Sequence, residues 1–301
     1  LLAEPQTADG VLKRPDLLAE TEIIFSGWGA PKLDSKFLEM APKLKAVFYG
    51  AGSVRAMVTD AMWERGILVT SSWAANAIPV AEFTLAQILF SLKLGWRWMY
   101  RGKAERKYPR RDTEMPGAYG STVGLVSLGM IGRRVAGLLR QFDLKVIAYD
   151  PFASQAACDE LGVERVGLDD VFRLSDVVSL HTPWLKETEN MIRGEHFRLM
   201  KHNATFLNTA RGAVVAEEEM LDVMQERPDL TAVLDVTYPE PPAETSRIFT
   251  LPNVFLTPHV AGSLGKECRR MGRYAVEECR KYLAGEPLTW QVTREMAATM
   301  A

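Results

Sequence analysis

Three side chains in this 301-residue chain, Arg211, Glu240 and His259, have complementary chemistry. An arginine is permanently charged, and its fork of N–H groups matches a carboxylate in a bidentate manner. A histidine titrates near pH ~6.5, so it can give or take a proton at neutral pH. A glutamate hydrogen-bonded to that imidazole would orient it and favour its protonated form. A single histidine in a sequence is more often structural than catalytic. The prediction of a site that binds a carboxylate and moves a proton therefore depends on Arg211, Glu240 and His259 occurring together.

Short apolar runs predict the strands that must position these residues. Helix-like stretches alternate with the runs, which predicts an α/β fold with parallel sheets. The polar residues cluster where the later strands end, at the edge where open α/β sheets bind ligands. The predicted strands are residues 23–25, 46–49 and 67–70 in a first, smaller α/β unit, and residues 122–126, 144–149, 177–180, 204–208, 230–236 and 254–256 beyond it.

Residues 121–150 read as one strand, a tight turn, a helix and a second strand. The turn is a G-x-G-x-x-G sequence in which Ser127 replaces the first glycine. Gly129 would let the backbone approach a pyrophosphate, and Gly132 would let the helix pack close to the strand. The free N–H groups of the helix's first turn would supply the anion site. A glycine-bearing turn in any α/β protein is the alternative for a motif with one glycine missing, but its place in a complete βαβ unit favours a dinucleotide site.

Asp150 ends the second of these strands, 150 − 132 = 18 residues after Gly132. A carboxylate there can accept hydrogen bonds from an adenosine ribose and repel a 2′-phosphate, which indicates NAD rather than NADP.

The composition bounds the class of protein. With 47% hydrophobic and 25% charged residues, the chain is long enough for two domains with separate cores. The formal charge of −2 provides no field that favours nucleic acid or an anionic membrane. No apolar run reaches the roughly 20 residues that span a bilayer, so we expect a cytoplasmic protein with no membrane partner. The three widely spaced cysteines contain no C-x-x-C, and neither disulfides nor a metal site is expected.

Residues 80–99 are predicted to form one long helix, with Pro79 at its first turn, that links the two domains. Residues 97–111 then carry seven basic residues against one acidic residue, with interleaved aromatic residues. A nucleic-acid patch would look similar, but the balanced charge elsewhere favours an exposed arm at a subunit contact.

From about Gly50 onwards the sequence resembles the D-isomer-specific 2-hydroxyacid dehydrogenases. Six motifs carry the resemblance in the family's order: GLVSLGMIG, YDP, SDVVSLHTP, FLNTARG, LDV with EP, and TPHVAG. The family's fold would be a Rossmann-type doubly wound parallel sheet that binds the cofactor, with a smaller flavodoxin-like α/β substrate domain. We expect residues 1–94 and 285–301 to form the substrate domain and residues 95–284 the NAD-binding domain, as a homodimer built through residues 97–111.

The resemblance implies an NAD-dependent oxidoreductase that interconverts a D-2-hydroxy acid and its 2-keto acid. Arg211 would bind the substrate carboxylate, and His259, paired with Glu240, would be the acid/base. The amides of Gly52 and Ser53 would help to hold the carboxylate. The cofactor would be contacted by Thr84, Gly129, Met130, Ile131, Gly132, Asp150, Thr182, Pro183, Thr209, Ala210, Arg211, Asp235, His259 and Gly262.

Some points stay open in the sequence. Ser127 departs from the family motif, and the loop after Gly52 is about one residue longer than the commoner form, so the substrate and the role of Arg55 are undetermined. Relatives that oxidise formate have glutamine at the position of Glu240, which disfavours that activity. An NAD-sensing scaffold protein is the rival class, and a turnover assay with NADH and 2-keto acids separates the two. No clear strand precedes residues 16–20, which leaves open whether a first strand precedes Leu1.

Overall fold

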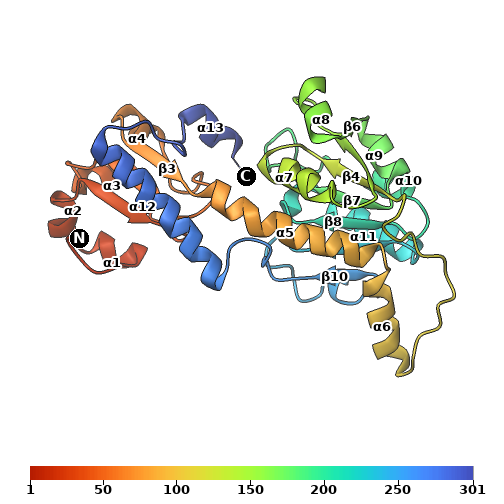
Figure 1. Cartoon of the computed structure of the whole chain (residues 1–301). Coiled ribbons are helices and arrows are strands. Elements are labelled where there is room, and N and C mark those ends of the chain that lie inside the picture. Colours follow the sequence, from red (N-terminus) through yellow and green to blue (C-terminus); the bar gives the residue numbers. More distant parts are fainter. Residues whose placement is uncertain (301) are drawn as a thin grey trace. The chain divides into compact units, whose positions relative to one another are not determined.

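The computed structural model describes residues 1–300 (Figure 1). The chain divides into two compact units. The smaller unit consists of Leu1–Asn76 together with the residues from Ser263 onwards, and the larger unit is Ala77–Gly262. These boundaries differ from the expected ones, which lay after residues 94 and 284.

The larger unit contains a sheet of seven strands, all parallel, in the order β10-β9-β8-β7-β4-β5-β6. The sheet begins at the interior strand β4, runs outwards through β5 and β6, and returns to β7 on the other side of β4. This is the doubly wound, Rossmann-type order that the sequence predicts, and it puts a topological switch point between β4 and β7. The strands are β4 (Thr122–Val126), β5 (Lys145–Tyr149), β6 (Glu164–Arg165), β7 (Val177–Leu180), β8 (Thr205–Asn208), β9 (Thr231–Leu234) and β10 (Val254–Leu256).

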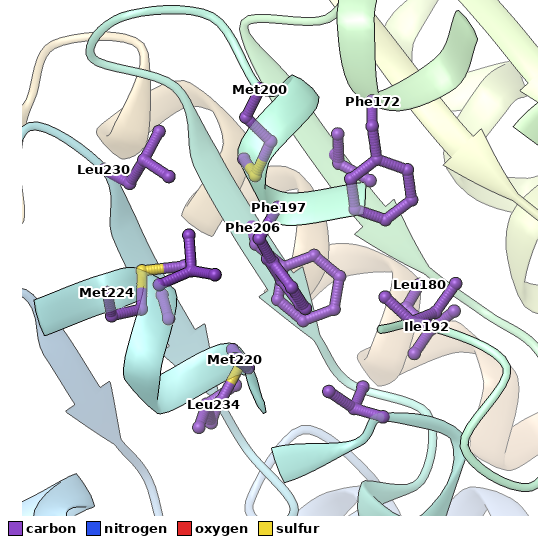
Figure 2. Packing of buried hydrophobic residues seen from close by; sticks show 14 of the residues in the cluster. Phe172, Leu180, Ile192, Phe197, Met200, Phe206, Met220, Met224, Leu230 and Leu234 are labelled. Carbon is purple, nitrogen blue, oxygen red and sulfur yellow. The ribbon is translucent and has the colours of Figure 1, made fainter. Parts of the chain in front are cut away.

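Helices cover both faces of this sheet. Successive strand residues point to opposite faces, so Phe206 packs in one core and Leu207 in the other. Figure 2 shows the first core, in which Phe206 lies close to Phe172 and Phe197. The helices of the larger unit are α6 (Gly95–Glu105), α7 (Met130–Leu139), α8 (Gln155–Leu161), α9 (Leu168–Leu174), α10 (Gly194–Leu199) and α11 (Glu217–Glu226), with short 3₁₀ turns at Gly212–Val214 and Arg247–Phe249.

The single helix expected over residues 80–99 is wrong, because the structure has two helices there. Helix α5 (Trp73–Ser91) contains Pro79 in its interior, and α6 begins after Leu94, whose φ of 51° is left-handed. The chain can turn so tightly because Gly95 lies against Phe90, whose ring would be 2.4 Å from a Cβ on that glycine.

Helix α5 also explains the first unit boundary. It begins in the smaller unit, but its residues Ala81 and Ile88 are fully buried in a core of the larger unit. By length and composition alone this helix could cross a membrane, although half of the relevant stretch is buried inside the protein, as in the core helix of a globular domain.

The smaller unit has a three-stranded parallel sheet in the order β1-β2-β3. Helix α12 packs on one face of it, where Ala275 and Cys279 contact Ala46 and Phe48, and therefore α12 belongs to this unit rather than to the larger one. The elements are α1 (Ala8–Leu12), α2 (Pro15–Ala19), β1 (Ile23–Ser26), α3 (Ser35–Met40), β2 (Ala46–Tyr49), α4 (Asp60–Glu64), β3 (Leu68–Ser71), a 3₁₀ turn at Gly265–Glu267, α12 (Cys268–Ala284) and α13 (Arg294–Thr299).

The packing around Phe206 yields a prediction about stability. Replacing this fully buried ring by alanine in Phe206→Ala should lower the free energy of unfolding by about 3–5 kcal/mol, because both the transfer free energy and a cavity are involved. Phe152→Ala is the control, since Phe152 is 94% exposed and should change stability by less than about 0.5 kcal/mol. Chemical denaturation measures both, and equal losses would contradict the packing.

Candidate functional site

The strands β7, β8, β9 and β10 of the larger unit end at the same level of the sheet. Leu180, Asn208, Leu234 and Leu256 are successive Cα partners across β7, β8, β9 and β10. Val126 partners Leu180 on one side and Tyr149 on the other. The residues that follow these strand ends therefore emerge at one edge of the sheet, where open parallel sheets bind ligands. They are Ser127, Asp150, His181, Thr209, Asp235 and Thr257.

His259 and Glu240 meet at this edge. The Nδ1 atom of His259 lies 2.6 Å from Oε1 of Glu240, and both side chains are about half exposed, at 48% and 42%. Since Nδ1 faces the carboxylate, Nε2 is the ring nitrogen that can exchange a proton with a ligand. His259 has a left-handed backbone, with a φ of 53°, and its N–H donates to the carbonyl of Asp235 at 2.9 Å.

Asp235 holds the loop that carries His259. Its buried carboxylate accepts hydrogen bonds from the backbone N–H groups of Val260 and Ala261, both at 2.9 Å. It also accepts one from the hydroxyl of Thr257 at 2.5 Å. The expected contact between Asp235 and the cofactor stays a prediction, and the structure gives this residue a second task, which is to shape the turn around the histidine.

Arg211 lies on the neighbouring loop after β8. The side chain of Asn208 bridges that loop, accepting from the N–H of Ala210 at 3.0 Å and donating to the carbonyl of Arg211 at 3.1 Å. The guanidinium donates to the carbonyl of Ala210 at 2.7 Å. Burial lowers the pKa of Arg211 and the negative charge of Glu240 opposes that effect, so Glu240, which contacts His259, also acts electrostatically on Arg211.

A direct backbone contact joins the Arg211 loop to the segment that leads to Glu240. A Cβ on Gly212 would lie 2.0 Å from the carbonyl carbon of Thr237, so only glycine fits. Glu217, in the first turn of α11, adds a hydrogen bond to the same segment by accepting from the N–H of Tyr238 at 3.2 Å. Burial raises the pKa of the Glu217 carboxyl. Sequence reasoning missed the contact and this bond, and the only hint was the glycine that follows Arg211.

The glycine-bearing turn has the geometry of an anion site. Gly129 precedes α7, and a Cβ built on it meets nothing within 4 Å, so the space above the turn is open. A Cβ on Gly132 would lie 2.2 Å from the carbonyl oxygen of Ser127, which explains the glycine there. Met130 and Ile131 form the first turn of α7, whose N–H groups can face a phosphate. The turn therefore fits the pyrophosphate of a dinucleotide.

Asp150 lies beside this turn. One carboxylate oxygen accepts from the N–H of Leu128 at 2.7 Å, and the other accepts from the N–H groups of Phe152 and Ala153 at 2.8 and 2.9 Å. A carboxylate has about four acceptor positions. The carboxylate of Asp150 therefore organises the turn with part of its hydrogen-bonding capacity, and its contact with a ribose stays a prediction.

The remaining predicted cofactor residues occupy the same edge. Thr84 on α5 is fully buried, and its hydroxyl lies 3.0 Å from that of Thr209. Thr182 follows β7, with Pro183 after it, and Gly262 is the last residue of the larger unit. The predicted substrate residues Gly52 and Ser53 belong to the smaller unit. Within that unit, the carbonyl of Gly52 accepts from the hydroxyl of Ser71 at 2.5 Å.

His181 is buried beneath this edge. Its Nε2 lies 3.1 Å from the hydroxyl of Ser179, while its Nδ1 has no hydrogen-bond partner among the described residues. Burial lowers the pKa of His181 to about 4. This histidine is therefore neutral at physiological pH. Among residues 1–300, no group of three or more His, Cys, Asp or Glu side chains is arranged to hold a metal ion.

Comparison with known proteins agrees with the class of fold and then identifies the family. Residues 86–261 match the family description "D-isomer specific 2-hydroxyacid dehydrogenase, NAD binding domain". The chain belongs to this family, and its larger unit is an NAD-binding domain. YoaD of Bacillus subtilis, named as a 2-hydroxyacid dehydrogenase, is 36% identical over 236 residues, which are 76% of this chain and 67% of YoaD.

Two further relatives show how far the similarity extends. The D-3-phosphoglycerate dehydrogenase of Methanocaldococcus jannaschii is 31% identical over 294 residues, which cover 95% of this chain but 54% of that protein. This chain thus spans about half the length of that relative. A D-lactate dehydrogenase from Aquifex aeolicus, solved with NAD and lactic acid, is 30% identical with a TM-score of 0.70, over 90% of this chain and 86% of that one.

The contact at Gly212 yields a prediction. Gly212→Ala should lower the free energy of unfolding by about 1–3 kcal/mol, because the new methyl group overlaps backbone atoms that must move. The matched control is Gly137→Ala in helix α7, where a Cβ meets nothing within 4 Å and alanine should stabilise by roughly 0.5–1 kcal/mol. Urea titrations compare the two variants, and a neutral Gly212→Ala would disprove the close contact.

The buried His181 predicts a pH dependence of stability. The folded state takes up the proton only near pH 4, whereas an unfolded chain takes it up near pH ~6.5, so unfolding binds a proton between these values. The free energy of unfolding should therefore fall by about 3 kcal/mol as the pH drops through this window. His181→Gln should lose less stability over the same range in urea titrations. Parallel pH profiles for the two proteins would contradict the assignment.

Proposed function

We propose that this chain is an NAD-dependent dehydrogenase that interconverts a D-2-hydroxy acid and the corresponding 2-keto acid. The observation that carries the proposal is the Glu240–His259 pair, which lies at the ligand-binding edge of an NAD-binding domain with Arg211 on the neighbouring loop. An acid/base pair and a carboxylate-binding cation are what the reaction requires beyond the cofactor. The named relatives, among them D-3-phosphoglycerate and D-lactate dehydrogenases, act on acids of this class.

The residues would divide the work as follows. NADH, when bound, supplies the hydride that reduces the carbonyl carbon. Arg211 binds the substrate carboxylate through its fork, and burial strengthens that interaction by excluding water. His259 donates its Nε2 proton to the carbonyl oxygen during reduction and removes it during oxidation. Glu240 orients the ring through Nδ1 and stabilises the positive charge that the ring carries when protonated.

The cofactor would lie along the edge of the larger unit. The turn of Gly129, Met130, Ile131 and Gly132 would face the pyrophosphate, and Asp150 the adenosine ribose. The remaining contacts would come from Thr84, Thr182, Pro183, Thr209, Ala210, Asp235 and Gly262. The smaller unit would be the substrate domain, and Gly52 and Ser53 within it stay predicted substrate residues.

Assembly as a homodimer through residues 97–111 is part of the proposal. Arg97 itself bonds to the side chain of Asn203 at 2.6 Å and to the carbonyl of Asp229, so it anchors the base of this arm within its own unit. Tyr100 and Tyr108 further along are exposed, which suits an interface rich in aromatic and basic side chains. Light scattering tests the dimer. A cytoplasmic location stays a prediction from composition.

His259 provides the direct test of the proposed chemistry. His259→Ala should lower kcat for 2-keto acid reduction by about 10²–10⁴-fold, since general acid catalysis contributes that much. Glu240→Gln should cause a smaller loss, because the amide oxygen still accepts a hydrogen bond while the charge is gone. The assay follows NADH absorbance against a panel that includes glyoxylate and hydroxypyruvate. His202→Ala is the control, as His202 is exposed. Near-normal turnover of His259→Ala would refute the role.

Asp150 should set the choice of cofactor. Its carboxylate would repel the 2′-phosphate of NADPH, so kcat/KM should favour NADH clearly. Asp150→Asn removes the charge but keeps an acceptor for the N–H of Leu128, and the preference should narrow. An unaltered enzyme that uses NADPH and NADH equally well would overturn this assignment.

A further inference from the structure

Ser127 takes the first glycine position of the dinucleotide turn, and the structure shows how it is accommodated. Its φ of 79° lies in the left-handed region, which disfavours any residue with a Cβ. Its hydroxyl lies 2.9 Å from the hydroxyl of Thr182, the second residue after β7. The unfavourable backbone conformation is therefore accompanied by a hydrogen bond that glycine could not make.

This bond spans the switch point of the sheet. Ser127 follows β4 and Thr182 follows β7, the two adjacent strands between which the winding of the sheet reverses. Dinucleotides bind in the crevice at this point. A hydroxyl-to-hydroxyl bond across it joins the turn that would face the pyrophosphate to the loop of Thr182 and Pro183, which would line another part of the cofactor.

The surroundings hold both hydroxyl groups in place. The N–H of Ser127 donates to the carbonyl of Tyr149 at 2.8 Å, and its carbonyl oxygen packs against Gly132. Thr182 is 97% buried, and its hydroxyl also lies 3.4 Å from the carbonyl of Val126. Each hydroxyl has one proton and can accept as well. In one arrangement the Thr182 hydroxyl donates to the carbonyl of Val126 and accepts from the Ser127 hydroxyl. In the other the Thr182 hydroxyl donates to the Ser127 hydroxyl. The bond between the two loops is present in both arrangements.

We propose that Ser127 is a positioning residue for the cofactor, whose hydrogen bond to Thr182 holds the two loops at the switch point in the conformation that binds the dinucleotide. The inference rests on the proposed function, because it concerns how the same site receives NAD(H). A preformed site binds more tightly, since less conformational freedom is lost on binding. The effect of the bond should therefore appear in cofactor affinity more than in the chemical step.

The test measures the Kd of NADH by fluorescence titration, the melting temperature, and kcat with a 2-keto acid. Ser127→Ala keeps a Cβ at a positive φ but loses the bond, and should raise the Kd by about five- to tenfold. Ser127→Gly loses the bond but relaxes the backbone, and should have a smaller effect. Thr182→Val, which keeps the shape, should resemble Ser127→Ala. For Ser127→Ala and Ser127→Gly, kcat should stay within about twofold.

The double variant and a control decide between positioning and mere folding. If the hydroxyls act through each other, Ser127→Ala with Thr182→Val should weaken binding about as much as one change alone, rather than by the product of the two. Ser175→Ala is the control, because the Ser175 hydroxyl is buried in the same unit with no hydrogen-bond partner among the described residues. Its Kd should equal that of the unaltered protein.

The outcomes separate this inference from the function on which it rests. If the unaltered protein binds NADH and the Ser127 and Thr182 variants bind it equally well, the inference fails and the proposed function stands. A lower melting temperature with an unchanged Kd would likewise show that the bond serves folding alone. If the unaltered protein binds no NADH, both proposals fall together.

Discussion

The candidate site depends on a single constraint, the common level at which the parallel strands of the larger unit end. The ladder that pairs Val126, Leu180, Asn208, Leu234 and Leu256 brings together residues from segments separated by up to 130 positions in sequence. A slip of one residue in any strand would turn its side chains to the opposite faces and displace the loop that follows. The two buried cores oppose such a slip, because β4, β7, β8 and β9 each contribute residues to both. The geometry of the site is thus maintained by the apolar layers around it.

Much of this fold can be predicted from sequence, because strands buried on both faces read as continuous apolar runs. The predicted strands at 46–49, 122–126, 177–180 and 254–256 agree with β2, β4, β7 and β10 to the residue. Strand β6 was not predicted, because it consists only of Glu164–Arg165, two exposed charged residues. The break between α5 and α6 was missed because apolar residues recur on both sides of it and the left-handed Leu94 has no signature in residue type.

The candidate site, like the fold, could be predicted only in part. The polar residues after each strand could be selected from sequence, because the type of a residue indicates what its side chain can do. The contacts that hold those residues in place could not be predicted. The carboxylate of Asp235 bonded to the N–H groups of Val260 and Ala261, and Glu217 bonded to the N–H of Tyr238, are contacts with backbone atoms that every residue possesses. Such partners leave no trace in the composition of a distant segment. The compact units differ from the predicted domains for a related reason, because the sequence does not show on which sheet α12 packs.

The contact between Gly212 and Thr237 also bears on how this edge can change over evolutionary time. Two loops that touch through backbone atoms, with no side chain between them, cannot adjust to each other by exchanging one residue type for another. Their separation is fixed by backbone atoms alone. A substitution that changes what the protein recognises without moving these loops must therefore lie on the sides of the loops that face outwards, or in the other unit, and it leaves the distance between the segments that carry Arg211 and Glu240 in place. Such substitutions leave the spacing of Arg211 and Glu240 in the fold unchanged.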